Sequence, residues 1–163
     1  MSKQTARRRL ARIVPIVAAV AALFLGASPA SAQETDGAFI AEGKAKVREM
    51  VNAERAKAGC VPLTTTGSLV RAAAAQSSVQ AQRDEVSHRG RHGKSIKARL
   101  GGLGFSQVAE NVAQYPTAEA AVAGWMGSPR HRANILNCAF TKTGVGVRKS
   151  ASGKVYWTQT FGG

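Results

Sequence analysis

Three histidines and a few acidic residues are the side chains of this chain most able to do chemistry. The histidines are His88, His92 and His131, and the acidic residues nearest to them in sequence are Asp84, Glu85 and Glu110. Glu110 stands apart because it lies in an apolar run between Val108 and Val112. A carboxylate in such a run needs a partner, since an unpaired buried charge is costly. We therefore expect His88 and His131 to converge on Glu110.

Two imidazoles and one carboxylate admit two interpretations. They can bind a divalent cation such as zinc with an open coordination position, or they can form a hydrogen-bonded structural cluster in which Glu110 orients a histidine. The sequence contains no histidine pair at helical spacing and no short metal-ligand motif. The residues alone leave both interpretations open. His92, next to Gly93, is expected to be a solvent-facing loop residue.

The segment WMGSPRHRANILN, residues 125–137, carries His131 between two arginines. Ser128 and Pro129 make a good helix start, because serine can accept from unpaired N–H groups and proline fits the first helical position. A solvated basic turn is the plain alternative. A Ser–His nucleophile is not favoured: Ser87 directly precedes His88 in an extended loop, and helix capping is the simpler role for Ser128.

The elements that must position these residues follow from periodicity and capping. Apolar residues at helical spacing predict one helix over 36–58, ended by Gly59, and a second over 69–83, capped by Ser68. Ser95 begins a short helix that ends at Leu100, and Thr117 begins another. The second helix has an alanine-rich face suited to close packing against a sheet or another helix.

The carboxyl-terminal half changes to strand patterns. Residues 107–113 form a short half-buried extended segment, and residues 143–149 and 154–161 alternate at period two around a turn at 150–153, which predicts a hairpin. Helices first and strands late predict a single α+β domain, with helices packed on a small, mostly antiparallel sheet.

Residues 1–32 are predicted to be a removable export signal. A basic segment, which contains Lys3 and four arginines, precedes a 13-residue apolar run from Ile13 to Leu25, and Ala30-Ser31-Ala32 offers a cleavage site before Gln33. Thirteen apolar residues are too few to span a bilayer comfortably. The domain would then comprise residues 33–163. The arginine cluster leaves general secretion and twin-arginine export as alternatives.

Cleavage leaves a basic protein. Five of the 23 Lys and Arg residues leave with residues 1–32 and none of the 9 Asp and Glu residues do, so the remaining formal charge is 18 − 9 = +9. Outside the cytoplasm the obvious polyanions are envelope polymers and lipid headgroups. Aromatic residues are not interleaved with the basic ones, so nucleic acid is not an expected partner. We expect a secreted or envelope-associated monomer.

Two cysteines, Cys60 and Cys138, are the whole cysteine content. An even count in an exported protein favours a disulfide, and two cysteines allow one intramolecular pairing. This bridge would link residues 78 positions apart and contribute roughly 4–5 kcal/mol in the chain-entropy model. Two free buried thiols and a Cys–His pair are the alternatives, and both are less favoured.

Four motifs in order resemble the bacterial branch of the CAP superfamily, the cysteine-rich secretory protein, antigen 5 and pathogenesis-related (SCP) domain. They are AENVA at 109–113, WMGSPRHRANILN at 125–137, GVGV at 144–147 and YWTQTFG at 156–162. The similarity extends over residues 39–162. It implies an α-β-α sandwich in an extracellular, often disulfide-linked protein, with a cleft of two His and acidic residues that binds a divalent metal in some members.

Carried onto this chain, the resemblance assigns the cleft to His88, Glu110 and His131. Ala109 and Arg130 stand where the family motifs have glycine. The eukaryotic pattern has a further histidine and glutamate, whose places here resemble Tyr156 and Ser128, so the full eukaryotic tetrad is absent.

Two functions are compatible with these residues. The first is an envelope-associated binding module whose cleft recognises a lipid, a small molecule or an envelope polymer, with or without a bound cation. The alternative is a metal-assisted hydrolase of peptide or envelope polymer, with Glu110 as general base. A chelator should abolish the activity of the second and need not affect the first.

Overall fold

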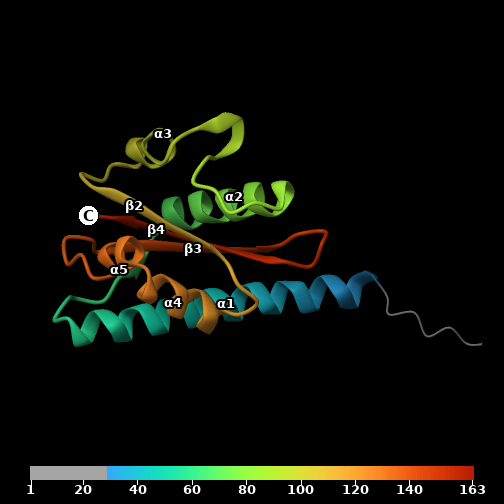
Figure 1. Cartoon of the computed structure of the whole chain (residues 1–163), viewed down its shortest axis with the longest axis horizontal. Coiled ribbons are helices and arrows are strands. Elements are labelled where there is room, and N and C mark those ends of the chain that lie inside the picture. Colours follow the sequence, from blue (N-terminus) through green and yellow to red (C-terminus); the bar gives the residue numbers. More distant parts are fainter. Residues whose placement is uncertain (1–28) are drawn as a thin grey trace, which may run out of the picture.

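The computed structural model describes the backbone of residues 29–163 and the side chains of residues 36–163, which form an α-β-α sandwich (Figure 1). One face of the sheet is covered by helices α1 (Pro29–Lys57), α4 (Ala118–Gly127) and α5 (Pro129–Ile135). Helices α2 (Gly67–Arg83) and α3 (Ile96–Leu100) lie on the other side. The predicted α+β class and sandwich are confirmed.

The sheet has four strands in the order β1-β3-β4-β2. Strands β3 (Lys142–Lys149) and β4 (Val155–Gly162) form the predicted hairpin, and β2 (Val108–Gln114) pairs antiparallel with β4. The two-residue β1 (Thr64–Thr65) pairs parallel with β3 and was not predicted, because two exposed threonines carry no periodic pattern. Strand β2 lies at an edge of the sheet, and this position matters for the site.

The two faces of the sheet are packed differently. On the α1 and α4 face, Trp157 and Phe161 of β4 join the apolar core with Val47 and Trp125. On the α2 face the backbones themselves approach closely: a Cβ atom at Gly144 or Gly146 would collide with the backbone of α2. Glycine is therefore required at these two positions, and the alanine-rich face of α2 packs against the sheet as predicted.

Hydrogen bonds replace apolar packing between α2 and the sheet. Gln80 Nε2 donates to Thr158 Oγ1 at 2.9 Å, and Thr160 Oγ1 donates to the Leu69 carbonyl at 3.1 Å. At the carboxyl end of α2, Asp84 adopts a left-handed conformation with φ 52° and accepts from Tyr156 Oη at 3.0 Å. These bonds fix α2 relative to β4, and α2 in turn supports the loop that carries His88.

Helix boundaries differ from the predictions at several caps. Helix α1 begins at Pro29, upstream of the predicted start. Thr66, not Ser68, is the N-cap of α2, and Ser128 caps α5 by position without a side-chain hydrogen bond. Ser95 and Thr117 act as predicted, since each side chain accepts from the backbone N–H three residues later.

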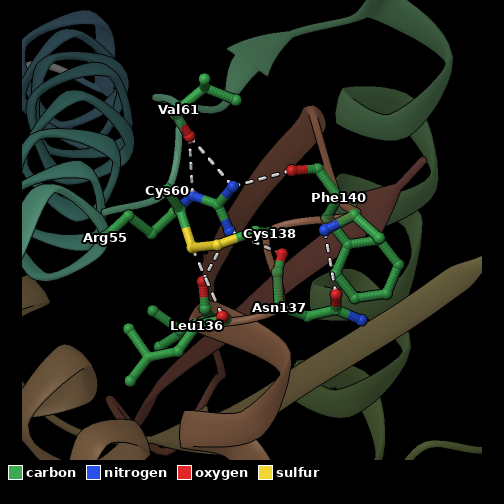
Figure 2. Close-up of a disulfide and its surroundings, with 9 residues drawn as sticks. Arg55, Cys60, Val61, Leu136, Asn137, Cys138 and Phe140 are labelled. Atoms are coloured by element: carbon green, nitrogen blue, oxygen red, sulfur yellow. Dashed lines mark hydrogen bonds between the residues drawn. A yellow bond between two sulfur atoms is a disulfide. The ribbon is translucent and has the colours of Figure 1, made fainter. Parts of the chain in front are cut away.

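The predicted disulfide joins Cys60 and Cys138 beside a buried arginine (Figure 2). Arg55 is 0% exposed, and its five N–H donors all reach backbone carbonyls. The acceptors are the carbonyls of Val61, Ile135, Asn137 and Phe140, at 2.7–3.1 Å. Arginine and disulfide together tie the end of α1 to the segment that follows α5.

The basic and apolar segments of the predicted export signal fall in residues 1–28, outside the described residues, and Ala30-Ser31-Ala32 lies within α1. The predicted cleavage before Gln33 and the domain range 33–163 stay predictions. None of the helices within residues 29–163 combines the length and the apolar character that crossing a bilayer requires.

Candidate functional site

His88 and Glu110 are in direct contact. Glu110 lies in the middle of β2, where its side chain is 0% exposed and points into the layer of α2 and α3. His88 Nδ1 lies 3.0 Å from Glu110 Oε1. We assign the proton of this bond to Nδ1, because an ionised carboxylate can only accept. His88 is 45% exposed, and its Nε2 lies on the side of the ring away from Glu110.

His131 approaches the His88 ring from the opposite layer, whereas the side-chain contacts of Glu110 are with His88 and Arg99. Asn111, the next residue of β2, points to the other face of the sheet, as successive strand residues do. Its Nδ2 donates to the His131 carbonyl at 3.0 Å, and its Oδ1 accepts from Asn134 Nδ2 at 2.8 Å. Helix α5 is thereby held against β2, and the ring centroids of His88 and His131 lie 6.4 Å apart. Two imidazoles from opposite layers meet at the edge strand.

The electrostatics of His131 reflect this position. Burial lowers the pKa of His131 below its ordinary value of 6.5, and the nearby His88 lowers it further. Burial disfavours a charged imidazole, and so does a second imidazole that can carry the same charge. Neutral His131 is therefore favoured while the cleft holds no anion.

The loop that carries His88 is held by side chains that bind its backbone. Gln76 Nε2 donates to the Ser87 carbonyl at 2.5 Å, and Gln80 Oε1 accepts from the Ser87 N–H at 3.3 Å. From the other side, Arg99 Nη2 donates to the His88 carbonyl at 3.0 Å. Helices α2 and α3 together position His88 before any ligand arrives.

Arg99 also pairs with Glu110. Its Nη2 lies 2.8 Å from Glu110 Oε1, and its Nη1 forms an ion pair with Oε2 at 2.7 Å. Gly90 makes room for this arginine, since a Cβ atom there would overlap the Arg99 side chain. The sequence predicted that Glu110 needs a partner but not that the partner is Arg99, one of five Lys and Arg residues between positions 86 and 109.

This pair bears on the expected cation. A divalent metal bound by His88, Glu110 and His131 needs the carboxylate as a ligand, and a guanidinium already supplies the positive charge there: Glu110 Oε1 accepts a hydrogen bond from it, and Oε2 lies in ion-pair contact with it. Across residues 36–163, no three His, Cys, Asp or Glu side chains are gathered in the manner of metal ligands. His88, Glu110 and His131 therefore do not fit a divalent cation as a set of three direct ligands.

The other sequence candidates lie outside this cluster. Asp84 accepts from Ser152, Lys154 and Tyr156 of the hairpin, so its role is structural. These partners, Lys154 first, hold the pKa of the Asp84 carboxyl well below its usual range. His92 is exposed in the loop, with φ 56°.

A pocket of about 350 Å³ adjoins His131. Its wall includes Ser128 and Trp125, together with Val86 and Tyr115, which are 47% and 39% exposed. Large apolar side chains at the mouth of a pocket are typical of ligand sites, in which a few polar groups set the orientation. The pocket thus places an apolar wall beside His131, the member of the histidine pair that lines it.

Comparison with known proteins identifies the family. Residues 48–161 match the model of the cysteine-rich secretory protein (CAP) family. The chain is 35% identical over 142 residues to the uncharacterized protein YkwD of Bacillus subtilis, covering 82% of this chain and 54% of YkwD. It is 33% identical to the uncharacterized membrane protein YlbC of the same bacterium, covering 71% of this chain and 33% of YlbC. The chain thus spans about half, or less, of these relatives.

Solved structures agree with this assignment. An extracellular protein containing an SCP domain from Bacillus anthracis is 27% identical, with a TM-score of 0.68 over 76% of this chain and 41% of that one. An outer surface protein from Borrelia burgdorferi has the same fold at 19% identity and a TM-score of 0.68, over 74% of this chain and 92% of that one. The chain belongs to the cysteine-rich secretory protein (CAP) family.

Proposed function

We propose that this CAP-family chain is an exported, envelope-associated binding module, whose cleft at His88, Glu110 and His131 holds a ligand without chemical turnover. Export is supported by the composition of residues 1–32 and by the similarity to a protein described as extracellular. Attraction to the envelope is supported by the formal charge of 18 − 9 = +9 on residues 33–163.

The observation that carries the proposal is that the ring centroids of His88 and His131 lie 6.4 Å apart, and that a pocket adjoins His131. The two rings come from different layers, and separate hydrogen bonds from Gln76, Arg99 and Asn111 hold the backbone at each of them. These hydrogen bonds hold two partly exposed imidazoles beside an apolar wall. Such a surface suits recognition of a ligand with polar and apolar parts.

The hydrolase alternative has weaker support. A general base must reach a water or a substrate proton within hydrogen-bond distance. The Glu110 side chain is 0% exposed, and its two oxygens are engaged by Arg99 and His88. In this arrangement Glu110 orients His88, which is a positioning role.

Retention of envelope material by the purified mature protein tests the function. We expect His88→Asn and His131→Asn to lose retained material, and His92→Asn to keep it. His92 is the matched control: it lies four residues from His88, is exposed, and has a left-handed backbone that asparagine tolerates. Cleaved products that depend on His88 would instead support the hydrolase. Equal retention by all three variants would show that the cleft does not bind the envelope material.

Export is tested separately. Mass spectrometry of the protein released from cells should find Gln33 at the amino terminus, because Ala30-Ser31-Ala32 is the small-residue site that follows the apolar run. Secreted protein that still carries residues 1–32 would contradict the predicted signal.

A further inference from the structure

We propose that the cleft between His88 and His131 binds a phosphate group, as a monoester or diester, and not a divalent cation. This inference rests on the proposed function, in which the same cleft is the ligand site. It adds the chemical class of the ligand, and it follows from the charges that the structure places around the two rings.

The first step concerns the negative charge of the site. Glu110 would attract a cation if its charge were free. Both of its oxygens instead contact the Arg99 guanidinium, at 2.7 and 2.8 Å, and the Arg99 side chain is 12% exposed. A paired carboxylate and guanidinium together carry no net charge. The charge that a ligand meets is therefore set by the groups around this pair.

The second step concerns those surrounding groups. Apart from Arg99, residues 86–109 contain four Lys and Arg and no Asp or Glu, and no acidic residue follows Glu119. Arg130 and Arg132 are exposed on either side of His131. Glu85 is the acidic residue nearest to His88 in sequence, while the acidic residues of α1 lie in the other helical layer. The two chain segments that carry His88 and His131 are therefore positively charged.

The third step concerns hydrogen bonding. His88 donates its Nδ1 proton to Glu110, so its Nε2 is left to face a ligand, and a protonated ring donates there. The ring of His131 lies close enough for both imidazoles to contact one small group. A phosphate group offers several strong acceptor oxygens and a negative charge, which two imidazoles and flanking arginines complement. A phosphate between the rings would also relieve the repulsion between two protonated imidazoles.

Nuclear magnetic resonance of the histidine rings in the mature protein tests the ligand class. We expect inorganic phosphate to shift the His88 and His131 signals in a saturable way and to leave His92 unchanged. Zinc chloride, added in a separate titration, should give no stoichiometric shift of His88 and His131. Zinc saturation of these two signals without a phosphate response would overturn the proposal.

Two arginine variants test the reason for this preference. Arg99→Met leaves Glu110 without its cation, so the variant should bind phosphate about ten- to a hundredfold more weakly and should gain a zinc response. Arg91→Met removes one positive charge from the exposed segment that precedes α3 without touching Glu110, and should weaken phosphate binding much less than Arg99→Met does, with no zinc response. If Arg99→Met does not fold, the phosphate and zinc titrations of the parent protein decide alone.

Two further arms identify the source of the phosphate. A poly(glycerol phosphate) oligomer that reproduces the ring shifts in solution points to a soluble polymer. Shifts and co-sedimentation that occur with phosphatidylglycerol vesicles, and not with phosphatidylcholine vesicles, point to a lipid headgroup. If envelope retention depends on His88 and His131 but neither phosphate source acts on them, the proposed function stands and the ligand class is wrong. If retention is independent of both histidines, the proposed function itself fails.

Discussion

Arg55, which is buried, and Arg99, which is partly buried, stand in contrasting environments. Arg55 is enclosed beside the disulfide and donates all its hydrogen bonds to main-chain carbonyls (Figure 2). Arg99 lies at the edge of the sheet, where it donates to one carbonyl and pairs with the carboxylate of Glu110. Burial lowers the pKa of Arg55, as expected for a cation whose acceptors are neutral dipoles.

The difference separates a structural arginine from one that sets the charge of a site. The partners of Arg55 are backbone groups, which no substitution can remove, so its loss must leave buried carbonyls without donors. The main partner of Arg99 is a side chain, so arginine and partner can be changed together.

Arg55→Met should produce the largest loss of stability. Four carbonyls that accept from the guanidinium would lose their donors in a buried corner, and we expect the free energy of unfolding to fall by roughly 3–5 kcal/mol. Urea denaturation measures this change. Arg48→Met is the matched control, since Arg48 is an exposed arginine of the same helix. A loss equal to that of the control would show that Arg55 is not a structural centre.

Removing the disulfide should cost somewhat less. The Cys60→Ser, Cys138→Ser double variant should lose roughly 2–5 kcal/mol of unfolding free energy, because the unfolded chain is no longer cross-linked. Thiol titration of the denatured, unreduced parent protein should find no free sulfhydryl. Two titratable thiols would contradict the bridge. The losses from Arg55→Met and from the double serine variant should also be non-additive, since both act on the segment around Cys138.

Glu110→Gln should cost less again, about 2 kcal/mol, because it leaves Arg99 partly buried without its anion. The sharper measurement is rescue. Combining Glu110→Gln with Arg99→Met should recover most of the lost stability, since replacing both members of a buried ion pair is often nearly neutral. No equivalent second substitution exists for Arg55. A double variant less stable than either single variant would show that Arg99, like Arg55, cannot be replaced together with its partner.

The sequence predicted the architecture well and the site in part. The β3–β4 hairpin and the short helix after Ser95 follow from local patterns, and two cysteines allow one bridge. The apolar surroundings of Glu110 indicated a buried carboxylate that needs a partner. They could not indicate Arg99, because the choice among nearby basic residues depends on the turn between α3 and β2. The sequence did not indicate that Arg55 is buried, because Arg55 lies in a helix rich in alanine and charged residues, where an arginine usually faces solvent.

The smallest predicted effect concerns His131 and the pH dependence of stability. The folded pKa of His131 is lower than its ordinary value of 6.5, which the unfolded chain should show. At pH values just below 6.5 the unfolded chain therefore binds a proton that the folded one does not. Folding stability must then decrease as the pH falls through this window, and the contribution is complete above it. The titratable group that acts on His131 is His88, whose ring centroid lies 6.4 Å away.

Urea denaturation from about pH 7.5 to about pH 5.5 isolates this contribution, since most carboxyl groups titrate at lower pH. His131→Asn should lose less stability across this range than the parent protein does, because the depressed imidazole is gone. His92→Asn, which alters an exposed histidine outside the cluster, should keep the parent slope. With phosphate present the slope of the parent protein should flatten, since an anion beside the two rings stabilises the protonated folded state. An unchanged slope in His131→Asn would mean that the imidazole is solvated like that of His92. The histidine site would then be as open to solvent as the loop of His92, and its contrast with the enclosed Arg55 would be of another kind than the structure indicates.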